Sequence, residues 1–87
     1  MLYTITFAFK KVKDADTLVD FLVDSGIDPD SEIELLYIKG KHIVNYVVDD
    51  MYVDPEEAIG YDVDFLEKEH IKNYSVSYRD ANTKANY

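Results

Sequence analysis

The chain has 87 residues and no cysteine, and its 18 acidic side chains against nine basic ones give a net charge of −9 at pH 7. This length suits a single domain with a modest core. The lack of cysteine excludes disulfides, thiolate nucleophiles and cysteine-ligated zinc. So negative a charge disfavours direct contact with nucleic acid or with anionic membranes. We find no secretory leader pattern and no apolar run near the ~20 residues of a membrane span, so we expect a cytoplasmic protein.

The beginning of the chain predicts a strand followed by a helix. Residues 3–9 alternate between large apolar and small side chains, which is typical of a half-buried strand. A helix should follow from about Asp14 or Asp16 to Ser25, because aspartate is a good N-cap and Gly26 a good C-terminal residue. The inward residues would be Tyr3, Ile5, Phe7 and Phe9 of the strand and Ala15, Leu18, Val19, Phe21 and Leu22 of the helix.

Residues 33–48 predict a β-hairpin closed at Gly40, which adopts positive φ freely. The loop is either Lys39-Gly40 or Gly40-Lys41. These two registers differ by an even step, so the same side chains share a face in both. The core face is expected to hold Ile33, Leu35, Tyr37, Val44, Tyr46 and Val48. The opposite face, called the open face below, would carry Glu34, Leu36, Ile38, Ile43, Asn45 and Val47.

Residues 54–57 are typical of a helix start, with Asp54 as N-cap, Pro55 at the first position and acids in the first turn. This helix should run to about His70, although a break near Gly60 is an open alternative. Residues 71–79 alternate again as a last strand, and 80–87 are interpreted as a flexible C-terminal tail. The inward residues would be Ala58, Ile59, Val63 and Leu66 of the helix and Tyr74, Val76 and Tyr78 of the strand.

The order of elements is β-α-β-β-α-β, which predicts one α+β domain over residues 1–79. With a right-handed crossover, the four strands form an antiparallel sheet in the order 4-1-3-2, and both helices cover one face. This is the ferredoxin-like arrangement. The competing prediction is an α+β fold in which residues 51–53 or 61–63 form a further short strand.

The predicted topology sorts the charged residues between the two ends of the molecule. One end is expected to carry bases, namely Lys10, Lys11, Lys13, Lys39, Lys41, His42, Lys68 and Lys72. The other end would be acidic, with Asp24, Asp28, Asp30, Glu32, Asp49, Asp50, Asp54, Glu56 and Glu57. The outer helix faces would add Asp16, Asp20, Asp62, Asp64, Glu67 and Glu69. Asp16, Asp20 and Asp24 stand four residues apart, and like charges at this spacing do not stabilise a helix.

The motifs for specific chemistry are weak. Residues 28–32 offer alternating oxygen ligands, but the calcium-loop pattern of an EF-hand lacks its glycine and its final glutamate, so we predict no metal site. His42 and His70 lie away from most carboxylates, which gives little support to acid–base catalysis. RNA-recognition domains share this topology, but they stack bases on aromatics where this chain has Thr4, Thr6 and Ala8. We therefore predict no enzyme, no cofactor and no direct nucleic-acid binding.

The open face is partly apolar at Leu36, Ile38, Ile43 and Val47, and exposed patches of this kind often mark an interface. Homodimerisation through the sheet and cover by the C-terminal tail would each explain the patch. An ordinary sheet edge with a few exposed aliphatic residues is the simpler interpretation.

The sequence favours a non-enzymatic interaction protein. In size and composition it resembles small, acidic phage-encoded inhibitors that mimic nucleic acid, including some anti-CRISPR and anti-restriction proteins. That resemblance implies a protein partner with a basic groove, such as a nucleic-acid-binding enzyme, whose Arg and Lys side chains pair with carboxylates. The alternative is a small-ligand-binding regulatory domain of the ACT type that dimerises through its sheet. The residues expected to bind the partner are Asp16, Asp20, Asp24, Asp28, Asp30, Glu32, Asp49, Asp50, Asp54, Glu56 and Glu57.

Overall fold

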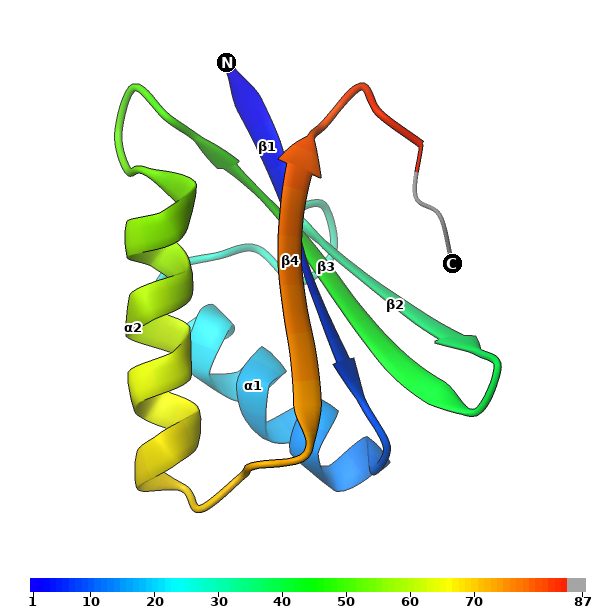
Figure 1. Cartoon of the computed structure of the whole chain (residues 1–87). Helices are drawn as coiled ribbons and strands as arrows, with labels where there is room; N and C mark the ends of the chain where they lie inside the picture. Colours follow the sequence, from blue (N-terminus) through cyan, green and yellow to red (C-terminus); the bar gives the residue numbers. More distant parts are fainter. Residues whose placement is uncertain (85–87) are drawn as a thin grey trace.

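The computed structural model describes residues 1–84, which form a four-stranded antiparallel sheet with two helices packed on one face (Figure 1). The elements in chain order are β1 (Leu2–Phe9), α1 (Val12–Asp24), β2 (Ile33–Ile38), β3 (Lys41–Asp49), α2 (Pro55–Lys68) and β4 (Tyr74–Asp80). The strands lie in the order β2-β3-β1-β4, so β1 and β3 are central. The chain is therefore an α+β protein. Within the described residues, neither 51–53 nor 61–63 forms a strand.

The hydrophobic core lies between the central strands and the two helices. Alternate residues of β1 and β3 face the helices because side chains alternate along a strand. The predicted inward faces of the first strand and the first helix are confirmed. The buried core consists of Ile5, Phe7, Phe9, Ala15, Leu18, Leu22, Val44, Tyr46, Val48, Ala58 and Leu66.

The β2–β3 hairpin has the predicted facing but not the predicted burial. Its loop is Lys39-Gly40, with φ of 53° and 78°, as a tight two-residue turn requires. Leu35 and Tyr37 share the helix-side face with Val44, yet they are 56% and 68% exposed. The helices pack on β1 and β3, so the edge strand β2 has no helix above it. The prediction that Leu35 and Tyr37 belong to the core is wrong.

Helix α1 begins at Val12, earlier than predicted, and its N-cap is Lys11. Asp14 is not a cap but lies in the first turn, where its negative charge favours the helix dipole. At the other end Gly26 has a φ of 99°, its N–H bonds to the carbonyl of Val23, and the N–H of Ile27 bonds to that of Leu22. This pair of hydrogen bonds is the Schellman motif, in which glycine is preferred at the left-handed position.

Helix α2 starts as predicted, with the Asp54 side chain accepting a 2.8 Å hydrogen bond from the backbone N–H of Glu56. It continues through Gly60 without a break. The helix ends in a second Schellman motif, with bonds from the N–H of His70 to Glu67 and from that of Ile71 to Leu66. Here the left-handed residue is His70, with a φ of 60°.

The last strand starts at Tyr74 rather than at 71, and Ile71 packs against the core just before it. Residues 81–83 form a turn in which the N–H of Ala81 bonds to Leu2 and the N–H of Thr83 bonds to Asp80. The proposed tail from 80 to 87 stays a prediction, and residues 85–87 lie outside the described part of the chain.

Candidate functional site

The eleven predicted partner-binding acids form what we call the acidic surface. They lie on three parts of the fold: the outer side of α1, the α1–β2 loop, and the segment from the last residue of β3 through the β3–α2 loop to the first turn of α2. In Figure 1 the β3–α2 loop lies near the N-terminus of the chain, at the end of the sheet away from the α2–β4 connection. The members are Asp16, Asp20, Asp24, Asp28, Asp30, Glu32, Asp49, Asp50, Asp54, Glu56 and Glu57.

Three of these acids build the local backbone. Asp28 accepts hydrogen bonds from the backbone N–H of Asp30 and the hydroxyl of Ser31, at 3.0 and 2.8 Å. The Ser31 hydroxyl is the main reason that the pKa of Asp28 lies below its usual value. Asp49 accepts from the N–H of Met51, and Asp54 caps α2. These carboxylates fold the loops and still present oxygen atoms at the surface.

Two further acids accept hydrogen bonds from tyrosines. Glu56 accepts a 3.1 Å bond from the Tyr78 hydroxyl, which raises the pKa of that tyrosine. Glu57 accepts a bond from the Tyr61 hydroxyl at 3.3 Å. Both contacts are exposed, so they order the first turn of α2 without neutralising its charge.

Asp50 pairs with the Met1 ammonium, and the other acids have no structural task that the described residues reveal. Asp16, Asp20 and Asp24, called the Asp stripe, are exposed on α1 about 6 Å apart along its axis, because each residue rises about 1.5 Å. Asp30 and Glu32 are exposed in the following loop. Among the described residues, the ion pairs are those of the Met1 ammonium with Asp49 and Asp50, at 3.7 and 2.9 Å. The Asp stripe is thus an uncompensated row of negative charge.

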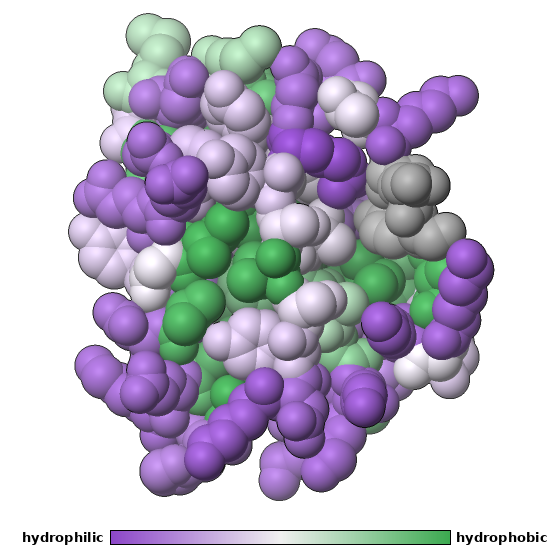
Figure 2. All heavy atoms as spheres, viewed as in Figure 1, coloured by the Kyte–Doolittle hydropathy of each residue, from purple (hydrophilic) through white to green (hydrophobic). Residues whose placement is uncertain are grey.

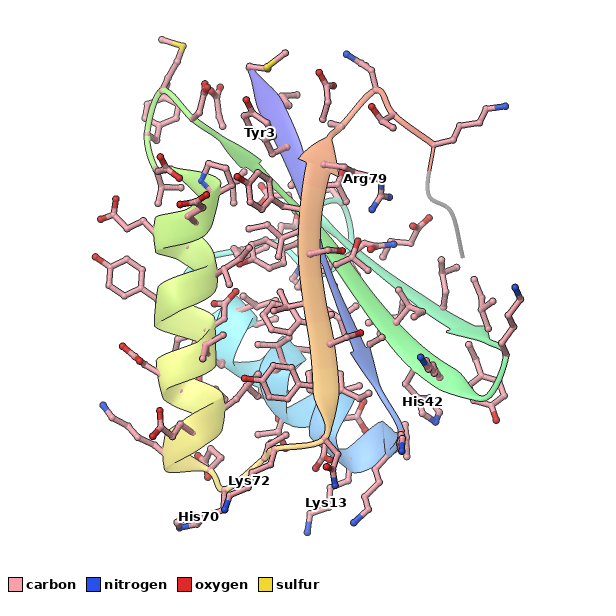
Figure 3. The ribbon with its side chains drawn as sticks, in the orientation of Figure 1. Tyr3, Lys13, His42, His70, Lys72 and Arg79 are labelled. Atoms are coloured by element: carbon pink, nitrogen blue, oxygen red, sulfur yellow. The ribbon has the colours of Figure 1, made fainter. Side chains whose placement is uncertain are left out.

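The bases gather elsewhere. Figure 3 shows Lys13, His70 and Lys72 together at the end of the molecule where α1 begins and α2 ends, with His42 near the hairpin turn. Lys10, Lys11 and Lys72 line one hollow at this end. The separation of the two signs of charge is partial, because Asp14 lines the same hollow and Arg79 lies toward the other end of the sheet.

The open face carries a polar chain across all four strands. Arg79 of β4 donates a 2.7 Å hydrogen bond to the Thr6 hydroxyl, which donates to Asn45 Oδ1 at 2.6 Å. Asn45 in turn donates to the Glu34 carboxylate at 3.0 Å. In Figure 3 the Arg79 side chain extends to the side of β4 away from the helices. Sequence reasoning missed this chain, which depends on the strand register.

The apolar residues of the open face lie around that chain, but they are unequally exposed. Ile43 is buried, Leu36 and Ile38 are half-buried, and Val47 is 41% exposed. Ile38 and Ile43 border a shallow hollow of about 520 Å³ that also contains Lys41 and Arg79. Figure 2 shows a matching hydrophobic area near the β2–β3 turn, and a larger one between α2 and β4.

One acid does not lie where the sequence analysis placed it. Asp62 was expected on the outer face of α2, but only 3% of it is exposed, and its Oδ2 accepts a hydrogen bond from the hydroxyl of the buried Tyr46. Burial raises the pKa of Asp62 to about 6 and raises that of Tyr46 as well. Asp62 lies four residues from both Ala58 and Leu66, so the helical spacing indicated an inward position. We expected it on the outer face because aspartate is charged.

The described residues include no cluster of three or more His, Cys, Asp or Glu side chains placed to hold an ion, residues 28–32 included. None of the helices within this part of the chain is both long and apolar enough to cross a bilayer.

Comparisons with known proteins complete the description. No protein-family model matches the chain, and no curated protein matches its sequence.

Proposed function

We propose that this chain is a non-enzymatic interaction protein that binds a basic protein surface through its acidic surface. The observation that supports the proposal best is the uncompensated Asp stripe, because no Lys or Arg side chain of the described residues is ion-paired with it. Like charges four residues apart cost helix stability, so an exposed row of them is better suited to recognition than to folding.

The favoured partner is a nucleic-acid-handling protein whose basic groove normally holds phosphates. Carboxylates on a rigid helix can accept the same hydrogen bonds from Arg and Lys that phosphates accept. A phage-type anti-defence factor, such as an anti-CRISPR or anti-restriction protein, is the sharpest form of this proposal. It involves no cofactor and no reaction step, a cytoplasmic location, and no direct contact of the chain with nucleic acid.

The scaffold for this function is, we infer, the ferredoxin-like arrangement. The β-α-β-β-α-β order and the sheet order β2-β3-β1-β4 support this assignment. A homodimer formed through Leu36, Ile38 and Val47 of the open face is compatible with the acidic surface remaining free.

The proposal is tested by capture from a host lysate with the purified protein as bait, followed by elution with duplex DNA. Three baits are compared: the wild type, the stripe variant D16N/D20N/D24N, and a control, D64N/E67Q/E69Q, that removes three exposed charges from α2 and its C-cap residue. We expect the wild type and the control to capture a nucleic-acid-binding protein that duplex DNA releases. The stripe variant should fail to capture it. Equal capture by all three baits, or capture that DNA does not disturb, would remove mimicry from the account.

A further inference from the structure

A hollow of about 440 Å³ lies beneath the first two turns of α2, next to the end of α1 and the helix-side face of β3. We call it the inter-helix pocket. Its wall is mainly apolar and comes from five parts of the chain, which contribute among others Leu22, Ile27, Val48, Val53 and Ala58. A volume of this size is typical of sites that hold small molecules.

The pocket follows from the way the helices meet. Phe21 of α1 and Phe65 of α2 stack on each other, with their ring centroids 4.1 Å apart. Beyond Phe21, α1 ends at Asp24 and the chain turns away at Gly26. No further turn of α1 therefore covers the beginning of α2, and side chains from the two adjacent loops only partly fill the space.

Asp62 is one of the residues that line this pocket, together with its hydrogen-bond partner Tyr46. Among the described residues its hydrogen bond is the one that Tyr46 donates to Oδ2. A carboxylate has about four acceptor positions, so most of the hydrogen-bonding capacity of Asp62 remains available. A second polar group, the Tyr61 hydroxyl, belongs to a residue that lines the same pocket and is 60% exposed.

The charges around the pocket are all of one sign. No Lys, Arg or His lines it in the described part of the chain, while Asp62 is almost fully buried. The tyrosine next to its mouth, Tyr61, bonds to Glu57 of the acidic surface. A buried carboxylate without a cation is unfavourable, and a cation that entered with an apolar body would relieve that cost and fill the pocket together.

We propose that the inter-helix pocket binds a small apolar primary amine, whose ammonium group donates hydrogen bonds to Asp62 and whose hydrocarbon body packs against Leu22, Val48 and Ala58. The neighbouring carboxylates would attract such a cation and repel anionic ligands. This site is separate from the Asp stripe, and the proposal does not depend on the function proposed above.

The experiment uses 2-phenylethylamine as the probe and 2-phenylethanol, its neutral analogue, as the comparison ligand. Amide chemical shifts of the isotope-labelled full chain are followed by NMR during each titration. We expect the amine to bind with a dissociation constant of about 1 mM or tighter, to shift residues that line the pocket, and to bind about tenfold more tightly than the alcohol.

Two variants separate the pocket from general attraction to an acidic protein. Asp62→Asn keeps the shape of the side chain and should abolish the preference for the amine over the alcohol, while its spectrum shows that it is folded. The control D64N/E67Q/E69Q removes more negative charge than Asp62→Asn does but should leave the preference unchanged. No shift at pocket residues with ~10 mM amine, equal binding of amine and alcohol to the wild type, or an unchanged preference in Asp62→Asn would each overturn the proposal.

Discussion

At the scale of single residues, Asp62 is the side chain whose environment differs most from what its chemistry prefers. Burial disfavours the ionised carboxylate and raises its pKa from 3.8 to about 6, although the hydrogen bond from Tyr46 partly opposes this shift. The folded protein therefore holds a proton on Asp62 over a pH range in which the unfolded chain has lost it. Linkage then requires that the contribution of Asp62 to stability is fully present below about pH 4 and is lost as the pH rises through about 6.

The first prediction concerns the variant Asp62→Asn. At neutral pH it should raise the free energy of unfolding by on the order of 2 kcal/mol, because the asparagine can accept the bond from Tyr46 without carrying a charge. Below about pH 4 the difference between variant and wild type should shrink toward zero. Urea unfolding followed by circular dichroism at several pH values measures this difference. A gain in stability that does not change with pH would contradict the raised pKa.

The control for that experiment is Asp64→Asn, on the same helix. Asp64 is exposed, so its replacement should change the free energy of unfolding by less than about 0.5 kcal/mol. A large effect there would mean that the helix responds to net charge rather than to burial of one carboxylate.

At the scale of elements, the two helices end in the same motif with different residues in the left-handed position. Gly26 occupies this position after α1 without steric cost, whereas His70 occupies it after α2 with a φ of 60°. A side chain in the left-handed region costs roughly 1–2 kcal/mol. Glycine at position 70 would also raise the conformational entropy of the unfolded chain, which offsets part of the stability gained by removing the side chain.

The second prediction follows from this comparison. His70→Gly should stabilise the protein by about 0.5–1 kcal/mol, and Gly26→Ala should destabilise it by about 1 kcal/mol. Thermal unfolding of the two variants gives both values. If the two substitutions changed stability in the same direction, the left-handed assignment of one position would be wrong.

The sheet gives a third prediction, at Asn45. This residue is buried on the open face between Thr6 and Glu34, and its side chain bonds to both. Asn45→Ala should cost about 1–3 kcal/mol, because it leaves the buried Thr6 hydroxyl without one partner. Ser77→Ala, at an exposed position opposite Thr6, should cost less than about 0.5 kcal/mol. Equal losses measured by urea unfolding would show that the polar chain does not stabilise the sheet.

Part of the fold could be predicted from the sequence alone. Alternation in residues 3–9 and helical spacing at Ala15, Leu18 and Leu22 were sufficient to place a strand and a helix. The start of α1 was misplaced because its N-cap is Lys11, a residue without the usual capping side chain. The exposure of Leu35 could not be foreseen, since pairing within a sheet does not tell which strands a helix covers.

The candidate site was predictable only in part. The exposed position of the Asp stripe followed from the period of α1, and the position of Lys13 and Lys72 at the end where α1 begins followed from the topology. The spacing of Asp62 from Ala58 and Leu66 indicated an inward position, but its bond to Tyr46 depends on how α2 packs against β3, which no local pattern gives. The row of hydrogen bonds from Arg79 to Glu34 likewise depends on the register of all four strands.

At the scale of the whole molecule, a net charge of −9 with ion pairs only at Met1 in the described residues implies that the folded state is under electrostatic repulsion. Salt screens such repulsion over a Debye length of about 10 Å at ~0.1 M. The fourth prediction is that raising NaCl from ~0.02 to ~0.5 M increases the unfolding temperature, by roughly 4–8 °C for a gain of about 1 kcal/mol. The stripe variant D16N/D20N/D24N should show a smaller increase. An unfolding temperature that stays constant or falls with NaCl would contradict uncompensated charge.

The most direct test of the central claim is the affinity of the captured partner for the Asp stripe. Isothermal titration calorimetry would compare the wild type, D16N/D20N/D24N and the matched control D64N/E67Q/E69Q against the purified partner at one salt concentration. Our account predicts that the stripe variant binds at least about tenfold more weakly, a loss of about 1.4 kcal/mol, while the control stays within about twofold of the wild type. Equal weakening by both variants would show that binding depends on net charge and not on the Asp stripe. Unchanged binding by the stripe variant would contradict the proposed role of the stripe.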